Sequence, residues 1–96
     1  MARVTYAGNA LDNLERAFEF LARNDPGAAA DAARAIRDAV QILSRHPLIG
    51  RPLHEGLREL VISFGRTGYV VLYRFLPRRD EVRVLALRHQ RELDYP

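Results

Sequence analysis

The chain contains no cysteine and no lysine. Without cysteine there is no disulfide, no thiolate nucleophile and no cysteine-ligated zinc site. No apolar run is long enough to span a bilayer, and residues 1–6 lack the apolar core of a signal peptide. We therefore expect a soluble cytoplasmic protein with no membrane contact. Three histidines without cysteine or HxxxH spacing predict no metal site, and no pattern in the sequence calls for a cofactor.

All 15 cationic residues are arginine, and they are unevenly distributed. Residues 1–56 hold 7 arginines against 7 acidic residues, whereas residues 57–96 hold 8 arginines against 5. The whole net charge of +3 thus lies in the C-terminal part. Such asymmetry indicates an acidic partner or a nucleic acid, although so small a charge does not choose between them. The guanidinium fork suits carboxylates, phosphates and aromatic faces alike.

The length of 96 residues predicts one domain that spans residues 1–96. A domain of this size has a small core, so a bound partner would stabilise it by mass action.

Two amphipathic helices are predicted in the first half, over residues 10–23 and 26–45. Asn9 is the expected N-cap of the first helix. Asp25 is the expected N-cap of the second, with Pro26 in its first turn. The apolar side chains that recur at helical spacing and are expected in the core are Leu11, Leu14, Phe18 and Leu21, followed by Ala29, Ala33, Ile36, Val40 and Leu43.

Strand patterns occupy residues 3–6, 57–64, 69–76 and 82–88. Turns are expected at 65–68 and 77–80, and residues 46–56 are expected to be irregular, with Leu48, Ile49 and Leu53 pinning that loop to the core. The order β-α-α-β-β-β predicts an α+β fold, in which an antiparallel helical hairpin packs on one face of a mainly antiparallel twisted sheet. The first strand is expected beside the central strands, and the far face of the sheet is expected to stay partly open.

Three segments in this order resemble toxins of the RelE/ParE superfamily. They are residues 50–60 (GRPLHEGLREL), the hairpin strand 68–74 (GYVVLYR) and the ending 88–92 (RHQRE). The resemblance implies the toxin of a type II toxin–antitoxin module that causes growth arrest or plasmid stabilisation. It also implies a ParD-like antitoxin that binds the toxin in a hetero-oligomer.

The superfamily has two branches, one that inhibits DNA gyrase by binding and one that cuts messenger RNA on the ribosome. A nuclease needs an acid, a base and cations around the charged phosphorane. The positions where the nuclease branch carries basic side chains align with Val61, Ser63 and Val70, none of which is basic. The ParE-like, gyrase-directed branch is therefore favoured, and the protein is then no enzyme.

Two alternatives stay open. A ribosome-dependent endoribonuclease would use as catalytic residues Arg58, His89, Arg91 and Tyr95. An inactive toxin would serve only as a binding or regulatory partner. The residues expected to contact the target are Arg58, Tyr69, Arg74, Arg88, His89 and Arg91. Arg58 shares a strand face with apolar residues, so it is also expected to have a carboxylate or carbonyl partner.

Overall fold

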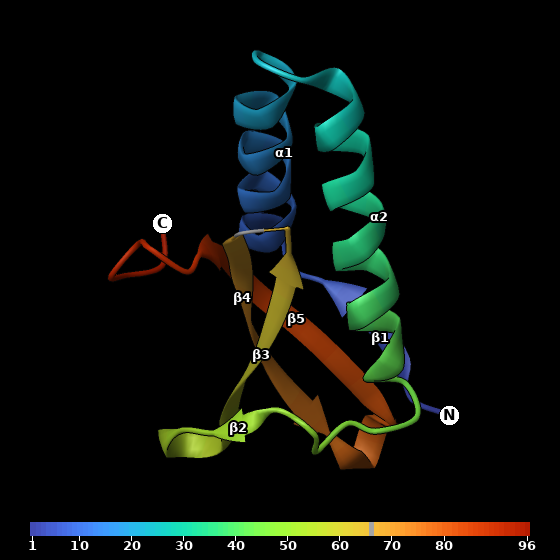
Figure 1. The fold of residues 1–96 in the computed structure, drawn as a ribbon. Coiled ribbons are helices and arrows are strands. Elements are labelled where there is room, and N and C mark those ends of the chain that lie inside the picture. The colour runs from blue at the N-terminus through green and yellow to red at the C-terminus, as the bar shows by residue number, and fades with distance from the viewer. Residues whose placement is uncertain (66) are drawn as a thin grey trace.

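Two helices lie on one face of a five-stranded sheet in the computed structural model of the chain, which describes residues 1–65 and 67–96 (Figure 1). The elements in chain order are β1 (Arg3–Tyr6), α1 (Gly8–Ala22), α2 (Pro26–Ile42), β2 (Arg51–Pro52), β3 (Leu57–Phe64), β4 (Thr67–Leu76) and β5 (Glu81–His89). Short 3-10 turns precede β3 and join β4 to β5. Within the described residues, no helix is long and apolar enough to cross a membrane.

The strand order across the sheet is β1-β5-β4-β3-β2. β3, β4 and β5 form the predicted antiparallel meander, while β1 pairs in parallel with β5, as Val4 opposite Val82 illustrates. The first strand therefore lies at the edge beside β5 and not beside the central strand β4. The predicted α+β class is confirmed, with β2 as an added two-residue edge strand that places Arg51 opposite Glu59.

The first helix differs from the prediction in its N-cap and in the face that it buries. It begins at Gly8, and Asn9 is not its N-cap, because Ala7 precedes the helix without a side-chain cap. The Asn9 side chain instead donates to the carbonyl of Leu85, and the Asn13 side chain accepts from the amide of Leu87. These two contacts satisfy backbone groups of β5 beyond the end of β1.

This orientation has a consequence for the predicted core stripe of α1. The helix turns Ala10 and Asn13 toward the sheet, which leaves Leu11 52% exposed and Phe18 45% exposed. Hydrophobic spacing alone therefore misplaced these two side chains, since the contacts of Asn9 and the buried Asn13 with β5 decide which face of the helix meets the sheet.

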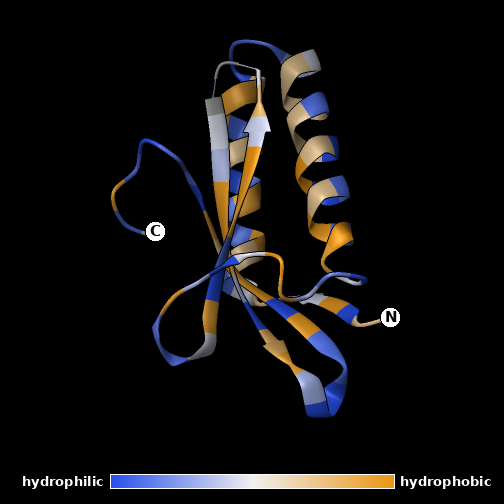
Figure 2. Cartoon of the chain, turned by 60° about the horizontal axis from the view of Figure 1, so that its bottom comes forward, coloured by the Kyte–Doolittle hydropathy of each residue, from blue (hydrophilic) through white to orange (hydrophobic). Residues whose placement is uncertain are grey.

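The second helix agrees better with the prediction. Asp25 accepts a hydrogen bond from the Ala28 amide as the N-cap, and Pro26 opens the helix. The helix ends at Ile42, three residues earlier than predicted, and Ala33 is exposed where Ala32 is buried. Figure 2 shows hydrophobic and hydrophilic bands alternating along both helices.

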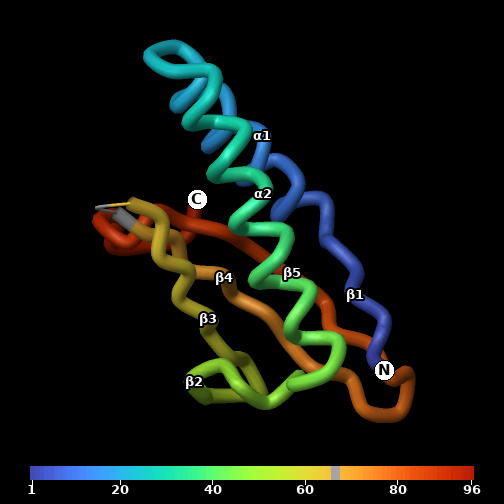
Figure 3. Tube along the Cα trace, turned by 45° about the vertical axis from the view of Figure 1, so that its right-hand side comes forward, coloured from blue at the N-terminus to red at the C-terminus, as the bar shows by residue number. Residues whose placement is uncertain are grey.

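The core fills the space between the helices and the facing side of the sheet. Its fully buried large side chains are Tyr73, Leu43, Val40, Val71, Val82 and Val84. The turn between the helices projects beyond the sheet, as Figures 1 and 3 both show. The predicted turn at 65–68 includes Arg66, which lies outside the described residues. Gly65 there has a φ of 59°, and β4 already begins at Thr67.

The loop between α2 and β3 is held in an unexpected way. Leu48 and Ile49 do not pin it to the core, because they are 59% and 58% exposed. Its backbone is bound instead. The buried Tyr73 hydroxyl donates to the Pro47 carbonyl and accepts from the Gly50 amide, at 2.8 and 2.9 Å. Arg58 adds bonds to the carbonyls of Leu48 and Gly50, which confirms that this arginine has carbonyl partners.

Candidate functional site

The face of the sheet opposite the helices carries the first part of the site. Ile62 and Leu87 belong to the core, so strand alternation places their neighbours Val61 and Arg88 on the open face. The register sets Val61 opposite Val70, and Val70 opposite Arg88. This row carries two valines and one arginine.

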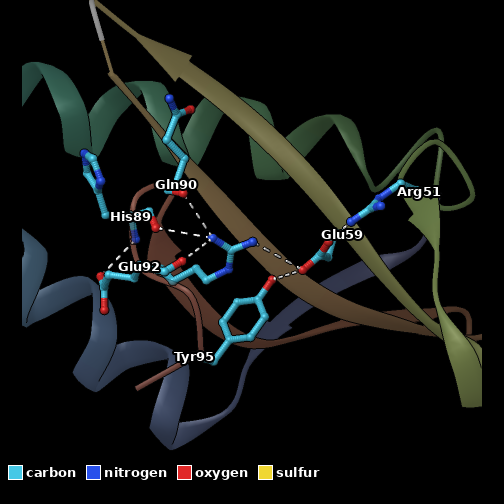
Figure 4. A network of polar contacts seen from close by, with 7 residues as sticks. Arg51, Glu59, His89, Gln90, Glu92 and Tyr95 are labelled. Atoms are coloured by element: carbon cyan, nitrogen blue, oxygen red, sulfur yellow. Dashed lines mark hydrogen bonds and ion pairs between the residues drawn. The ribbon is translucent and has the colours of Figure 1, made fainter.

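Glu59 lies on the same open face and is buried, with 8% of its side chain exposed. Figure 4 shows its carboxylate between Arg51 and Tyr95, and Arg88 also lies close to it. Arg51 forms an ion pair with one oxygen. The Tyr95 hydroxyl donates to the other oxygen at 2.7 Å, and Arg88 lies 3.8 Å from it. We call Arg51, Glu59, Arg88 and Tyr95 the Glu59 network.

Arg88 also organises the C-terminal tail, residues 90–96. Its guanidinium donates to the carbonyl of Glu92 at 2.7 Å and to those of His89 and Gln90 at 3.4 Å (Figure 4). Its central carbon lies 5.2 Å from the centre of the Tyr95 ring, in a cation–π contact. The one arginine in the row is thus already bound to a carboxylate, a ring and three carbonyls.

The electrostatics of the network follow from its geometry. Burial alone would raise the pKa of the Glu59 carboxyl, but the Tyr95 hydrogen bond and the charges of Arg51 and Arg88 together hold it below its usual value. Burial, with the Glu59 carboxylate second, raises the pKa of the Tyr95 phenol. Glu59 therefore stays ionised and Tyr95 stays protonated at neutral pH, so both arginines of the network lie against a charged carboxylate.

The second part of the site is a cleft of about 540 Å³ between α1, the end of β5 and the tail. Tyr69 and His89 meet in it edge to face, with ring centres 5.5 Å apart. Nδ1 of His89 accepts from the Arg91 amide at 3.1 Å, and the His89 amide donates to the Glu92 carboxylate at 3.0 Å. Arg16 and Phe20 of α1 form the opposite wall. The cleft therefore combines aromatic surface with three arginines, Arg16, Arg88 and Arg91.

Four of the predicted target-binding residues come together around this cleft, namely Tyr69, Arg88, His89 and Arg91. Tyr95, the possible catalytic tyrosine, is joined to them through Arg88 but reaches the open face. The remaining two predicted target-binding residues, Arg58 and Arg74, do not line the cleft. Arg58 holds the loop after α2, and Arg74 lies lower on β4, opposite Arg83.

Sequence reasoning missed Glu59, Arg51 and Arg16. Glu59 had a detectable signal, because it alternates with Val61 and is a carboxylate in a strand with an open face. Arg51 could be identified only once Glu59 was known, because Arg51 lies in the short strand β2 directly opposite Glu59. Arg16 looks like any exposed residue of an amphipathic helix, and no sequence pattern brings it to His89.

The chain is a small α+β protein. Its helical hairpin lies on one face of a mixed sheet, and Arg88 holds the tail beyond the last strand. Residues 4–94 match the family described as the ParE toxin of the type II toxin–antitoxin system parDE. The chain belongs to this family, and to the wider RelE/ParE superfamily that the sequence resembled. Membership in a toxin–antitoxin family implies an antitoxin partner.

Two proteins of Caulobacter vibrioides are similar over much of the chain. Toxin RelE3 is 34% identical over 92 residues, which cover 96% of this chain and 98% of that protein. Toxin RelE1 is 34% identical over 64 residues, covering 67% and 69% of the two chains. Among solved structures, a chain of the chromosomal ParDE system from P. aeruginosa shares the fold. It aligns with a TM-score of 0.74 at 19% identity over 93% of this chain and 96% of that one.

Proposed function

We propose that this toxin arrests growth by binding DNA gyrase and does not cut RNA. The Glu59 network is the observation that carries the proposal. Cleavage of a phosphodiester builds negative charge on the phosphorane, which needs free donors and cations. Here a buried carboxylate lies beside Arg88, the arginine of the row, and Val61 and Val70 occupy the neighbouring positions. Because Glu59 engages both arginines of the network, this surface offers few free cations to a phosphorane.

The cleft between α1 and the tail supplies the surface for binding the target. Arginine and aromatic side chains are the residues that most often dominate protein interfaces. Arg16, Arg91 and the Tyr69–His89 pair provide both kinds at one position, next to the basic C-terminal part of the chain. We infer that this cleft docks on gyrase or on its complex with DNA, with Arg88 keeping the tail in the required shape.

The antitoxin has a second surface available to it on the helical hairpin, which adjoins the cleft at Ala17 and Tyr69. A groove of about 560 Å³ runs along the two helices and is mostly apolar. Its lining includes Tyr6, Leu14, Phe18, Leu21 and Ile36, with alanines of α2 between them. An amphipathic helix with apolar anchors three and four residues apart fits such a groove. Antitoxin binding there would also cover the partly exposed Phe18.

Induced expression of the chain alone in a bacterial host tests the function, with plasmid topology and total messenger RNA measured together. Gyrase-dependent cleaved or relaxed plasmid with intact messenger is the expected result. Translation-dependent messenger cleavage with normal supercoiling would overturn the proposal. Growth without arrest would identify the third class, an inactive binding partner. Purified gyrase with the purified toxin then checks that the effect on plasmid is direct.

A ribosome-dependent endoribonuclease is the second candidate. Two observations favour it: both curated relatives carry the name RelE, and His89 and Arg91 share one cleft. Its acid or base would be His89, because an imidazole can accept or release a proton in general acid–base catalysis, and Arg91 would hold a phosphate. This candidate predicts ribosome-dependent cuts that vanish when His89 is replaced by alanine.

A further inference from the structure

One wall of the cleft is built from the tail and has little apolar support. Three residues that line the cleft lie beyond the end of β5, namely Arg91, Glu92 and Pro96. Residues 90–96, all of which the structure describes, form no helix or strand. Six of these seven residues are exposed, and Leu93 is 94% exposed. Polar contacts therefore hold this wall in place, because the tail buries little apolar surface.

Two groups of contacts hold the tail. The first forms the turn at residues 89–92, through backbone hydrogen bonds and the bond from Arg88 to the last carbonyl of the turn. The second lies further along the chain. Within the described residues, the polar contacts of residues 93–96 are those of Tyr95 with Glu59 and with Arg88. The outer part of the tail, residues 93–96, therefore depends on the side chain of Tyr95 for its position.

Glu59 is fixed by the sheet and not by the tail. It lies within β3, which pairs with β4 along its full length, and Arg51 of β2 forms an ion pair with its carboxylate. Its side chain is 8% exposed, so it has little freedom to follow Tyr95. Arg88 adds a second link, because it lies 3.8 Å from the Glu59 carboxylate and donates to the Glu92 carbonyl in the turn. Both groups of contacts are thus connected to this one carboxylate.

The geometry points to Glu59 as a positioning residue for the cleft, although its carboxylate lies on the open face of the sheet. Figure 4 shows Tyr95 reaching Glu59 from the tail. Through Tyr95 the carboxylate places the neighbouring Pro96 at the cleft, and through Arg88 it supports the turn that carries Arg91. Loss of the carboxylate would free the outer part of the tail and open the cleft at Pro96. The consequence for target binding rests on the proposed function, whereas the position of the tail does not.

Glu59→Leu tests this role, because leucine is similar in size and accepts no hydrogen bond. NMR relaxation of the backbone amides gives the order parameters of residues 93–95. We expect them to fall from about 0.85 in wild type to below about 0.6 in the variant, which is the difference between a rigid and a flexible backbone. The amide spectrum of the sheet shows whether the variant is folded.

Glu81→Leu is the matched control for this experiment. Glu81 is also buried in the sheet, where it pairs with Arg3 and Arg83, but it lies at the opposite end of β5 from the tail. The control is expected to lose stability and to keep the tail ordered. An ordered tail in Glu59→Leu, or an equal loss of order in Glu81→Leu, would overturn the inference.

Tyr95→Phe examines the same contact from the tail side and decides the matter if Glu59→Leu does not fold. It removes the hydroxyl that donates to Glu59 and keeps the ring against Arg88. The order parameters of residues 93–95 are expected to fall in the same direction as in Glu59→Leu. Order parameters equal to those of wild type would contradict a positioning role for Glu59.

Affinity for purified gyrase measures the consequence at the cleft. Glu59→Leu is expected to raise the dissociation constant about tenfold, because a released tail must be ordered again on binding. Glu81→Leu is expected to leave it unchanged.

Arg16→Ala changes the opposite wall of the cleft and separates the inference from the proposed function. If Arg16→Ala weakens gyrase binding while Glu59→Leu, with its tail released, does not, the cleft does not need Glu59 and the inference is wrong. If both variants bind gyrase like wild type although the tail of Glu59→Leu is released, the proposed function fails and the positioning of the tail by Glu59 stands.

Discussion

The Tyr95 hydroxyl donates a 2.7 Å hydrogen bond to the Glu59 carboxylate and so joins residues 36 positions apart in the chain. Terminal residues of small domains are usually poorly ordered unless something ties them down. Here the tie is made on the open face of the sheet, with Arg88 between the ring and the carboxylate. The tail is therefore part of the folded structure, and its shape at the cleft depends on Glu59.

Replacing Tyr95 with phenylalanine tests this tie. The ring and its contact with Arg88 remain, but the Glu59 carboxylate loses a donor. A hydrogen bond to a charged group is worth about 1.5–3 kcal/mol when buried, and the partly exposed site lowers the expected loss to about 1 kcal/mol. Urea unfolding measures the change. Tyr6→Phe is the matched control, because the Tyr6 hydroxyl has no hydrogen-bond partner among the described residues.

A second prediction concerns pH. The folded state holds the pKa of Glu59 below its ordinary value of 4.5, so this carboxylate stabilises the protein above that value. The contribution is lost as the pH falls through the lowered folded pKa. Wild type should therefore exceed Glu59→Gln in stability at neutral pH, and the difference should shrink in acid. Denaturant unfolding across this range gives the difference directly.

The matched control for this pH series is Glu15→Gln, an exposed glutamate of α1 with no ion pair among the described residues. It should unfold much like wild type at each pH. A gap between wild type and Glu59→Gln that stayed constant into acid would mean that the Glu59 charge does not stabilise the fold.

Gly50→Ala tests how tightly the loop between α2 and β3 packs against the sheet. An added Cβ would lie 2.6 Å from the Tyr73 ring and 2.8 Å from the Glu59 carbonyl oxygen. Both neighbours are part of the packed sheet, so the backbone of the loop must shift. Overpacking of this kind costs about 1–3 kcal/mol. Thermal unfolding checks it, and Gly8→Ala is the control, because nothing lies within 4 Å of its added Cβ. The control should be neutral or stabilising by up to about 1 kcal/mol.

Local patterns predicted much of the fold. Alternation identified β3 with its observed bounds, and the Asp25–Pro26 pair marked the start of α2, because capping and strand patterning depend on near neighbours. The orientation of α1 was not predictable in the same way. It depends on Asn9 and Asn13 meeting the backbone of β5, more than seventy positions away.

The residues of the candidate site also differ in how far the sequence could predict them. His89, Arg91 and Arg88 are close in sequence, so their proximity at the cleft could be expected. Glu59 could not be assigned to them, since only the sheet register brings it to Arg88 and Tyr95. The loop after α2 was misjudged for a related reason. Hydrophobicity suggested that Leu48 would be buried, whereas the core there is filled by a tyrosine from β4.

The last prediction separates binding from catalysis in the same variant. Alanine at both His89 and Arg91 removes a ring and a charge from the cleft. If the toxin acts by binding, the half-maximal concentration for gyrase inhibition should rise about tenfold or more while the plateau at saturation remains. Loss of a general acid or base would instead lower the rate at saturation by about 10²–10⁴-fold. Titration of the purified variant against gyrase, and against translating ribosomes, distinguishes these outcomes. Arg34→Ala, which removes the same charge from an exposed pair on α2, should match wild type in both assays.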